Sequence, residues 1–190
     1  GSEMCIRDSR FFFPTSIKGQ FRDNIRGLFH MQHSYLRIFS ASLYVPLDYG
    51  AVRDGLVRFQ LTYEQIEDYL QTHLSPEEQA GCRRLLALFW KMSSEMEQIL
   101  ILVESEKRGL EDPAALERFS AVCGYVIQEA GNMVCSRMKQ EPVSVRQAPV
   151  SSEVKGAPYL SALLKKYSQD VSALYRLALE RKNWAENGKK

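Results

Sequence analysis

The sequence lacks the features that mark membrane-spanning, secreted and disulfide-stabilised proteins. No apolar run is long enough to cross a bilayer, and no pattern of charged, apolar and then small residues marks a secretory signal. The four cysteines include no CxxC pair and have no nearby histidine, which argues against a zinc site. The net charge of +2 is too small to favour nucleic acid as a partner. We therefore expect a soluble cytoplasmic protein, or a periplasmic one if the chain was excised from a membrane receptor.

Several catalytic patterns are missing as well. The sequence has no glycine-rich phosphate loop, no paired-carboxylate site and no Ser-His-Asp order. His30 and His33 have no ExxH or HxxxE partner, so the di-iron bundle pattern is absent and we expect neither metal nor cofactor. With 190 residues, 45% of them hydrophobic and 25% charged, the chain can build one domain with a substantial core.

A long helix predicted over residues 76–108 organises the chain. Ser75 can accept hydrogen bonds from the free amides of its first turn, and Pro76 suits the first helical position. Glu78 can complete a capping box, and Gly109 is expected to end the helix in the left-handed conformation. One face of this helix is a continuous apolar seam, and further apolar residues lie outside that face: Leu88, Trp90, Ile99, Ile101 and Leu102. A helix that is apolar on several sides requires neighbours on several sides, so we predict a central rod.

Apolar residues at spacings of three and four predict four more helices, at about 15–44, 49–74, 113–140 and 158–186. Asp48 and Asp112 are the expected caps of the second and fourth helices in the chain. Because the first three connections are short, we predict an all-α fold in which four helices alternate in direction as an antiparallel bundle. Gly124 and Gly131 leave room for close helix approach. The fifth helix follows a proline-containing crossover.

The chain divides into four segments. Residues 1–9 are set apart, because Gly1 and Ser2 resemble a cloning scar and residues 4–9 resemble translated sequencing-adapter sequence. Residues 10–140 form the predicted four-helix core, residues 141–157 an extended linker, and residues 158–190 the fifth helix and tail of the same domain. A disordered linker with a loosely docked tail is the alternative.

The cysteines that remain, Cys82, Cys123 and Cys135, lie within apolar patterns, as is typical of buried free thiols in a reducing compartment. If the third and fourth predicted helices form a hairpin, Cys82 lies level with a position within one turn of Cys135. A disulfide between Cys82 and Cys135 is therefore a candidate, with free thiols as the alternative.

A basic stripe follows one side of the first predicted helix. It consists of Lys18, Arg22, Arg26, His30, His33 and Arg37. Such a stripe can bind a phosphate, a carboxylate ligand, a nucleic-acid backbone or an acidic partner helix. Alternatively it is a solvated face, or is neutralised by the acidic second helix. Trp90 lies outside the main seam of its own helix, so it is predicted to meet the fifth helix or to line a ligand pocket.

Our first functional hypothesis is a non-catalytic helical module that binds a protein partner or a small anionic ligand in regulation, sensing or assembly. Its predicted shape resembles the helical-bundle input domains of bacterial receptors. The first alternative is an enzyme with a pocket between helices. The spacing of Arg26 and His33 is similar to the arginine–histidine pair of HEPN-type helical ribonucleases, which makes such a nuclease the named case. The second alternative is a structural or viral assembly subunit that forms a homo-oligomer.

Overall fold

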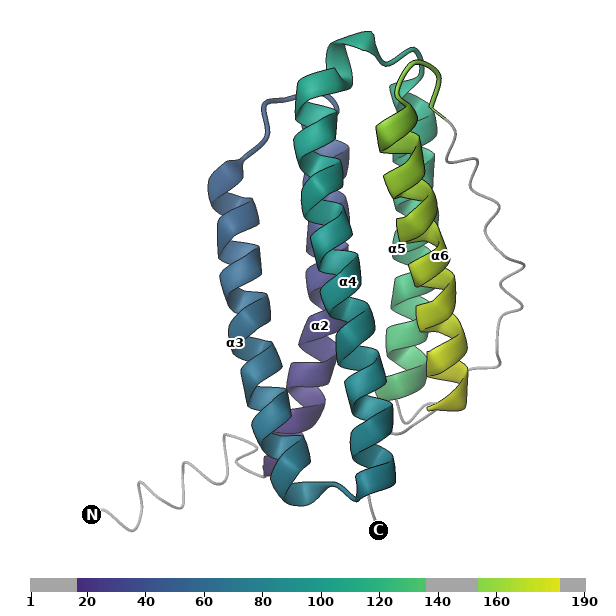
Figure 1. Cartoon of the computed structure of the whole chain (residues 1–190). Helices are drawn as coiled ribbons and strands as arrows, with labels where there is room; N and C mark the ends of the chain where they lie inside the picture. The colour runs from purple at the N-terminus through teal and green to yellow at the C-terminus, as the bar shows by residue number, and fades with distance from the viewer. Residues whose placement is uncertain (1–16, 136–153, 182–190) are drawn as a thin grey trace.

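The computed structural model describes residues 17–135 and 154–181, which contain helices and no strand, so the predicted all-α class is confirmed (Figure 1). The helices are α2 (Ile17–Ser42), α3 (Tyr49–His73), α4 (Pro76–Glu106), α5 (Pro113–Cys135) and α6 (Pro158–Glu180), with a 3-10 turn, η1 (Lys107–Gly109), after α4. The expected leader (residues 1–9), most of the linker and the outer ends of the fourth and fifth predicted helices lie outside the described residues. None of the described helices is both long and apolar enough to span a bilayer.

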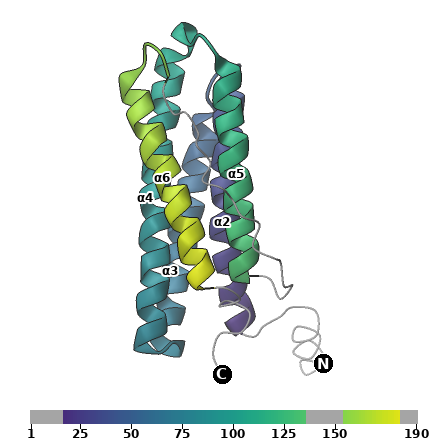
Figure 2. The ribbon, with the colours of Figure 1, turned by 90° about the vertical axis from the view of Figure 1, so that its right-hand side faces the viewer.

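The helices lie side by side in an elongated stack, but their neighbours do not follow chain order. In Figure 1, α2 and α4 run upward, whereas α3, α5 and α6 run downward. Helix α2 packs against α3, α4 and α5, and α6 packs against α4 and α5. Within the described residues α4 and α5 are not neighbours. Helices α2, α4, α6 and α5 therefore surround the core in that order, and α3 lies outside it against α2 and α4 (Figure 2).

This arrangement corrects the predicted packing. The short connection after η1 does not make α4 and α5 neighbours, because α6 takes the place beside α4. The buried residues of α6 are Leu160, Leu164, Tyr167, Asp170, Val171, Leu174, Leu177 and Ala178. One face of α6 packs against α4 and another against α5. The last described helix is thus part of the core, and α3 is the peripheral one.

Capping side chains begin three of the helices at the expected residues. The Ser75 hydroxyl accepts a hydrogen bond from the Glu78 amide at 3.2 Å and donates one to the Glu78 carboxylate at 3.0 Å. Asp48 and Asp112 each accept a hydrogen bond from the amide three residues later, at 3.0 and 3.2 Å. These bonds satisfy amides that have no partner within their helix. Local sequence therefore defines where α3, α4 and α5 begin.

The end of α4 differs from the prediction. Gly109 does not adopt the left-handed conformation, which among the described glycines occurs at Gly156 with φ 80°. Instead the helix tightens into η1, where the Lys107 ammonium donates to the carbonyl of Val45 at 3.0 Å and lies 2.7 Å from the Glu104 carboxylate. Glu104 in turn accepts from the Leu47 amide at 3.0 Å. The loop between α2 and α3 is thereby fastened to the end of α4.

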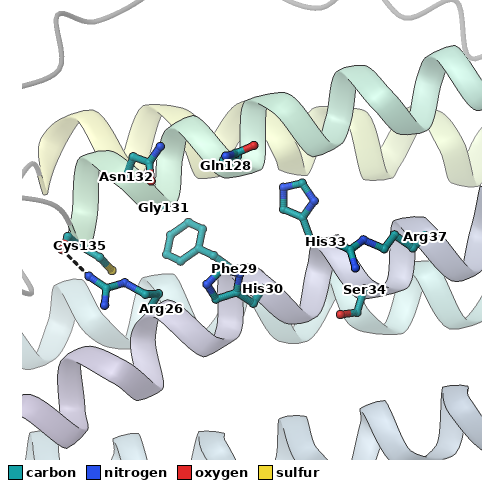
Figure 3. A pocket seen from close by; sticks show the side chains of 10 residues that line it. All are labelled: Arg26, Phe29, His30, His33, Ser34, Arg37, Gln128, Gly131, Asn132 and Cys135. Carbon is teal, nitrogen blue, oxygen red and sulfur yellow. Dashed lines mark hydrogen bonds between the residues drawn. The ribbon is translucent and has the colours of Figure 1, made fainter.

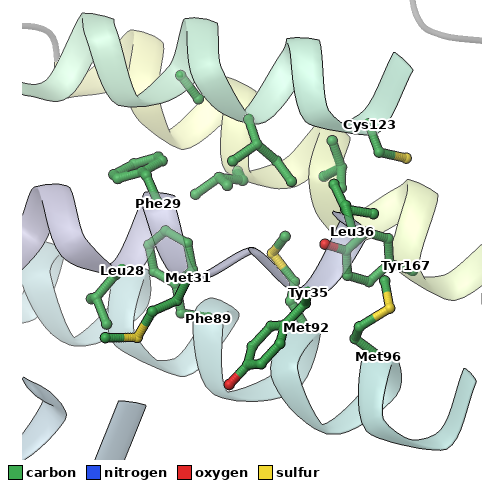
Figure 4. Packing of buried hydrophobic residues seen from close by; sticks show 14 of the residues in the cluster. Leu28, Phe29, Met31, Tyr35, Leu36, Phe89, Met92, Met96, Cys123 and Tyr167 are labelled. Carbon is green, nitrogen blue, oxygen red and sulfur yellow. The ribbon is translucent and has the colours of Figure 1, made fainter. Parts of the chain in front are cut away.

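Aromatic and sulfur-containing side chains fill the centre of the molecule (Figure 4). The rings of Phe29 and Phe89 meet edge to face, with centroids 4.9 Å apart. Met92, Met96 and Tyr167 are buried around them. Helix α4 contributes buried residues along almost its whole length and packs against three other helices, as α2 also does. Trp90 and Ile101, two of the apolar residues from which a central rod was predicted, are 56% and 52% exposed.

We expect Leu86→Ala or Phe89→Ala to lower the free energy of unfolding by about 2–5 kcal/mol, because each side chain is fully buried and its loss leaves a cavity. Urea unfolding followed by circular dichroism measures this change. Leu61→Ala is the control, because Leu61 on α3 is 55% exposed and its truncation should cost less than about 0.5 kcal/mol. Losses under 0.5 kcal/mol at both core positions would show that α4 is not central.

Candidate functional site: a basic groove between α2 and α5

The upper part of the basic stripe lines a groove between α2 and α5. Arg26, His30, His33 and Arg37 all border a pocket of about 490 Å³ (Figure 3). Lys18 does not border it and is exposed near the start of α2. Arg22 does not border it either, and its Nε lies 3.6 Å from the Asp23 carboxylate. The structure therefore brings four of the six stripe residues together at one site.

The opposite wall of the groove comes from α5. The lining residues besides the four basic ones are Phe29, Ser34, Gln128, Gly131, Asn132 and Cys135. None of the ten lining residues carries a carboxylate. The wall instead supplies the amide groups of Gln128 and Asn132, which can donate hydrogen bonds. Helix α3, whose acidic residues were the candidate counter-charges of the stripe, contributes no lining residue.

Two glycines of α5 allow α2 to come close. A Cβ atom on Gly124 would lie 3.2 Å from Cε1 of His33, and one on Gly131 would lie 3.1 Å from Cγ of Phe29. Both distances are shorter than an ordinary van der Waals contact, so the side chains of α2 occupy the space that a methyl group would need. Residues 124 and 131 lie seven apart, hence on one face of the helix. The expectation that they permit close packing is confirmed.

Arg26 lies at the end of the groove nearest the last residue of α5. Its Nη2 donates to the Cys135 carbonyl at 3.0 Å, and its Nη1 lies 3.8 Å from the Asp23 carboxylate (Figure 3). Arg26 therefore both anchors α5 to α2 and places positive charge at the border of the groove.

His33 is wedged between the two helices. Burial lowers the pKa of its imidazole below the ordinary value, and the charges of Arg37 and His30 lower it further. A hydrogen bond with the Gly124 backbone acts in the opposite direction. Its Nε2 is buried and has no hydrogen-bond partner among the described residues. His33 is therefore neutral at pH 7 and adds no positive charge to the groove at that pH.

Trp90 is not part of this groove. It is 56% exposed and packs against α3, with its ring centroid 5.8 Å from that of Phe59 and 5.7 Å from that of Tyr63. The contact covers the junction of α3 and α4. The ring contacts of Trp90 are thus with α3, where the sequence predicted the fifth helix or a ligand pocket.

The candidate disulfide is not formed. Cys82, Cys123 and Cys135 are all buried, and no disulfide joins Cys82 to Cys135. The premise of this bond was a hairpin of α4 and α5, and these helices are not neighbours. Burial raises the pKa of the Cys82 and Cys123 thiols to about 12, so both stay protonated and unreactive at neutral pH.

Sequence reasoning missed a buried polar layer in the core. The Tyr167 hydroxyl donates to Oε1 of Gln32 at 2.9 Å, and Nε2 of Gln32 donates to the Ser93 hydroxyl at 2.8 Å. All three side chains are buried. Ser93 lies four residues after Phe89 and seven before Leu100, so all three are on the same face of their helix. A polar residue on that apolar face is the signal in the sequence from which a buried hydrogen bond could have been predicted. Within the described part of the chain, no group of three or more potential ligands could hold a metal ion.

Comparisons with protein-family models, curated proteins and solved structures gave no match in any of the three. The resemblances to receptor input domains and to HEPN-type ribonucleases are therefore not supported by a match to a known protein. Functional inference rests on the groove itself.

We expect Gly124→Ala to destabilise the protein by about 1–3 kcal/mol, because the new methyl group forces His33 and α5 apart. Gly27→Ala is the matched control. Gly27 lies within α2 and a Cβ there would meet nothing within 4 Å, so its replacement should stabilise the helix by about 0.5–1 kcal/mol. Urea unfolding of both variants measures the difference, and equal effects would contradict the proposed close contact.

Proposed function

We propose that this chain is a non-catalytic helical-bundle module that binds a small anionic ligand in the groove between α2 and α5, in a regulatory, sensing or assembly role. The scaffold we infer is a four-helix bundle of α2, α4, α5 and α6, with α3 added outside. The observation that carries the proposal is the composition of the groove wall, in which four basic residues and two side-chain amides occur and no described lining residue carries a carboxylate.

The chemistry of the wall fits carboxylate or phosphate oxygens. Arg37 and His30 are exposed and project from α2 beside the groove, where they can approach a ligand from solvent (Figure 3). A guanidinium donates charge-assisted hydrogen bonds to oxyanions, and amides such as those of Gln128 and Asn132 add neutral donors on the facing wall. A volume of about 490 Å³ lies within the range of about 300–1,000 Å³ typical of small-molecule sites.

Both walls of the groove are helices, and helices hold side chains more firmly than loops do. Gly124 and Gly131 fix the distance between α2 and α5, and Arg26 ties their ends together. A ligand would therefore meet donors that are already in place. Such preorganisation reduces the entropy cost of binding.

We expect inorganic phosphate or acetate to bind the wild-type groove and Arg37→Gln to weaken that binding by roughly tenfold to a hundredfold. The estimate corresponds to the loss of a charge-assisted hydrogen bond of about 1.5–3 kcal/mol. Amide chemical-shift changes during titration measure both affinity and location. They should concentrate at the groove-lining residues of α2 and α5.

Arg118→Gln is the control for this titration. Arg118 also carries a guanidinium on α5, but it lies 3.6 Å from the Asp112 carboxylate and does not line the groove. Its replacement should leave anion affinity unchanged. Equal losses in the two variants, or shift changes spread over the whole surface, would show general charge attraction instead of a site.

One observation favours a second candidate function, a ribonuclease. Arg26 and His33, whose spacing resembles the HEPN pair, border the same groove. The neutral imidazole that burial produces is the form a general base requires, although its Nε2 is covered in this structure. RNA hydrolysis that disappears in His33→Asn while the fold is retained would support this reading. Hydrolysis that is absent from the wild type, or is unchanged in the variant, would exclude it. No specific observation favours the assembly-subunit hypothesis.

A further inference from the structure

Two acidic side chains meet inside the contact between α4 and α6. Glu95 of α4 is 6% exposed and Asp170 of α6 is 5% exposed. Lys91 reaches this pair from solvent. Its Nζ lies 3.1 Å from Oδ1 of Asp170 and 4.0 Å from Oε1 of Glu95. The ammonium group of Lys91 therefore lies close to both buried carboxyl groups.

The pair has too few donors for two ionised carboxylates. Both carboxyl oxygens of Glu95 and Oδ2 of Asp170 are buried and accept no hydrogen bond from a donor in the described residues. A buried carboxylate without donors is costly, and two adjacent ones repel each other. A single proton held between them removes both penalties, because a protonated Glu95 can donate to the Asp170 carboxylate.

The electrostatic surroundings agree with this geometry. Burial raises the pKa of Glu95 to about 8, and the adjacent Asp170 carboxylate contributes to the rise. Lys91 of the same helix and Lys166 of α6 lower it without cancelling those effects. Burial raises the pKa of Tyr167 of α6, and the charges of Glu95 and Asp170 raise it further, so its hydroxyl group keeps its proton. The other two helices around the core also supply side chains near Tyr167. The neutral Gln32 amide of α2 accepts its hydrogen bond, and the Cys123 thiol of α5 raises its pKa further.

We propose that Glu95 and Asp170 form a proton-dependent latch that seats α6 against α4, closed by one shared proton at neutral pH and loosened when that proton is lost in mildly alkaline solution. The latch lies in the contact between α4 and α6 and involves no residue of the groove, so it goes beyond the proposed function and does not depend on it. Among the described residues, another ion pair between α4 and α6 joins the exposed side chains of Arg84 and Glu180, at 3.6 Å. An exposed pair of this kind contributes little to stability, so it cannot substitute for the buried carboxyl pair.

The first test is the pH dependence of unfolding. Between the ordinary glutamate value of 4.5 and about 8, the folded state holds a proton that the unfolded state has lost. The folded-to-unfolded ratio should therefore fall as pH rises from 5.5 to 8, by up to about tenfold per pH unit, and then level off. Urea unfolding across this range measures the slope. Histidines titrate in the same window, so the informative quantity is the difference between the wild type and a variant.

Glu95→Gln is that variant, because glutamine keeps the shape of the protonated acid and cannot ionise. The free energy of unfolding of this variant should depend less steeply on pH than that of the wild type, and the difference in slope should correspond to one proton. Glu180→Gln is the matched control, since it removes an exposed carboxylate from the same contact and should retain the wild-type slope. Identical slopes in the wild type and Glu95→Gln would overturn the shared proton.

A second measurement uses the wild-type protein alone and does not depend on whether a variant folds. The side-chain carboxyl ¹³C signal of Glu95 should titrate with a midpoint near 8, and a midpoint near 4.5 would overturn the proposal. Amide hydrogen exchange at pH 7 and 9, corrected for intrinsic rates, tests the release of α6. Protection should fall in α6 and persist in α2, and unchanged protection in α6 would show that no latch opens.

Discussion

The hydrogen-bond chain from Tyr167 through Gln32 to Ser93 determines how the helices fit together. It joins α6, α2 and α4 across the middle of the core, although α6 and α2 are not neighbours around it. Moving α6 by one helical turn would leave the Tyr167 hydroxyl and Oε1 of Gln32 without their partner, at a cost of about 1–3 kcal/mol for each. An apolar seam alone tolerates such a shift, whereas a polar chain of this kind does not. The position of α6 along the core is thereby specified.

The position of α6 explains the rest of the arrangement. Because α6 lies between α4 and α5, α5 can pack only against α6 and α2. Gly124 and Gly131 then bring α2 close enough for Phe29 and His33 to fill the space beside the α5 backbone. The groove borders this contact, and α3 is on another side of α2, where it cannot cover the basic residues (Figure 2). The open groove is a consequence of which helices are neighbours.

Features that depend on local sequence were predictable, and features that depend on packing were not. The caps at Asp48, Ser75 and Asp112 follow from bonds within a few residues, and the helical class follows from spacing. The neighbours of α4 depend on side-chain fit between helices far apart in the sequence, which no short connection reveals. The same reason explains the error at Gly109, because Lys107 holds the end of α4 through carbonyls of a distant loop.

The site was predictable on one wall only. The stripe from Arg26 to Arg37 can be predicted from the sequence of α2 alone. Whether its charge is neutralised depends on the helix that faces it. That helix is α5, which presents side-chain amides, whereas α3 would have presented carboxylates. The burial of Glu95 and Asp170 likewise depends on α6. These two charged sites lie on opposite contacts of the ring, α2 with α5 and α4 with α6. The fold therefore separates a groove without carboxylates from a carboxyl pair with too few cations, so neither can neutralise the other. The groove stays available to an external anion, and the carboxyl pair must hold a proton.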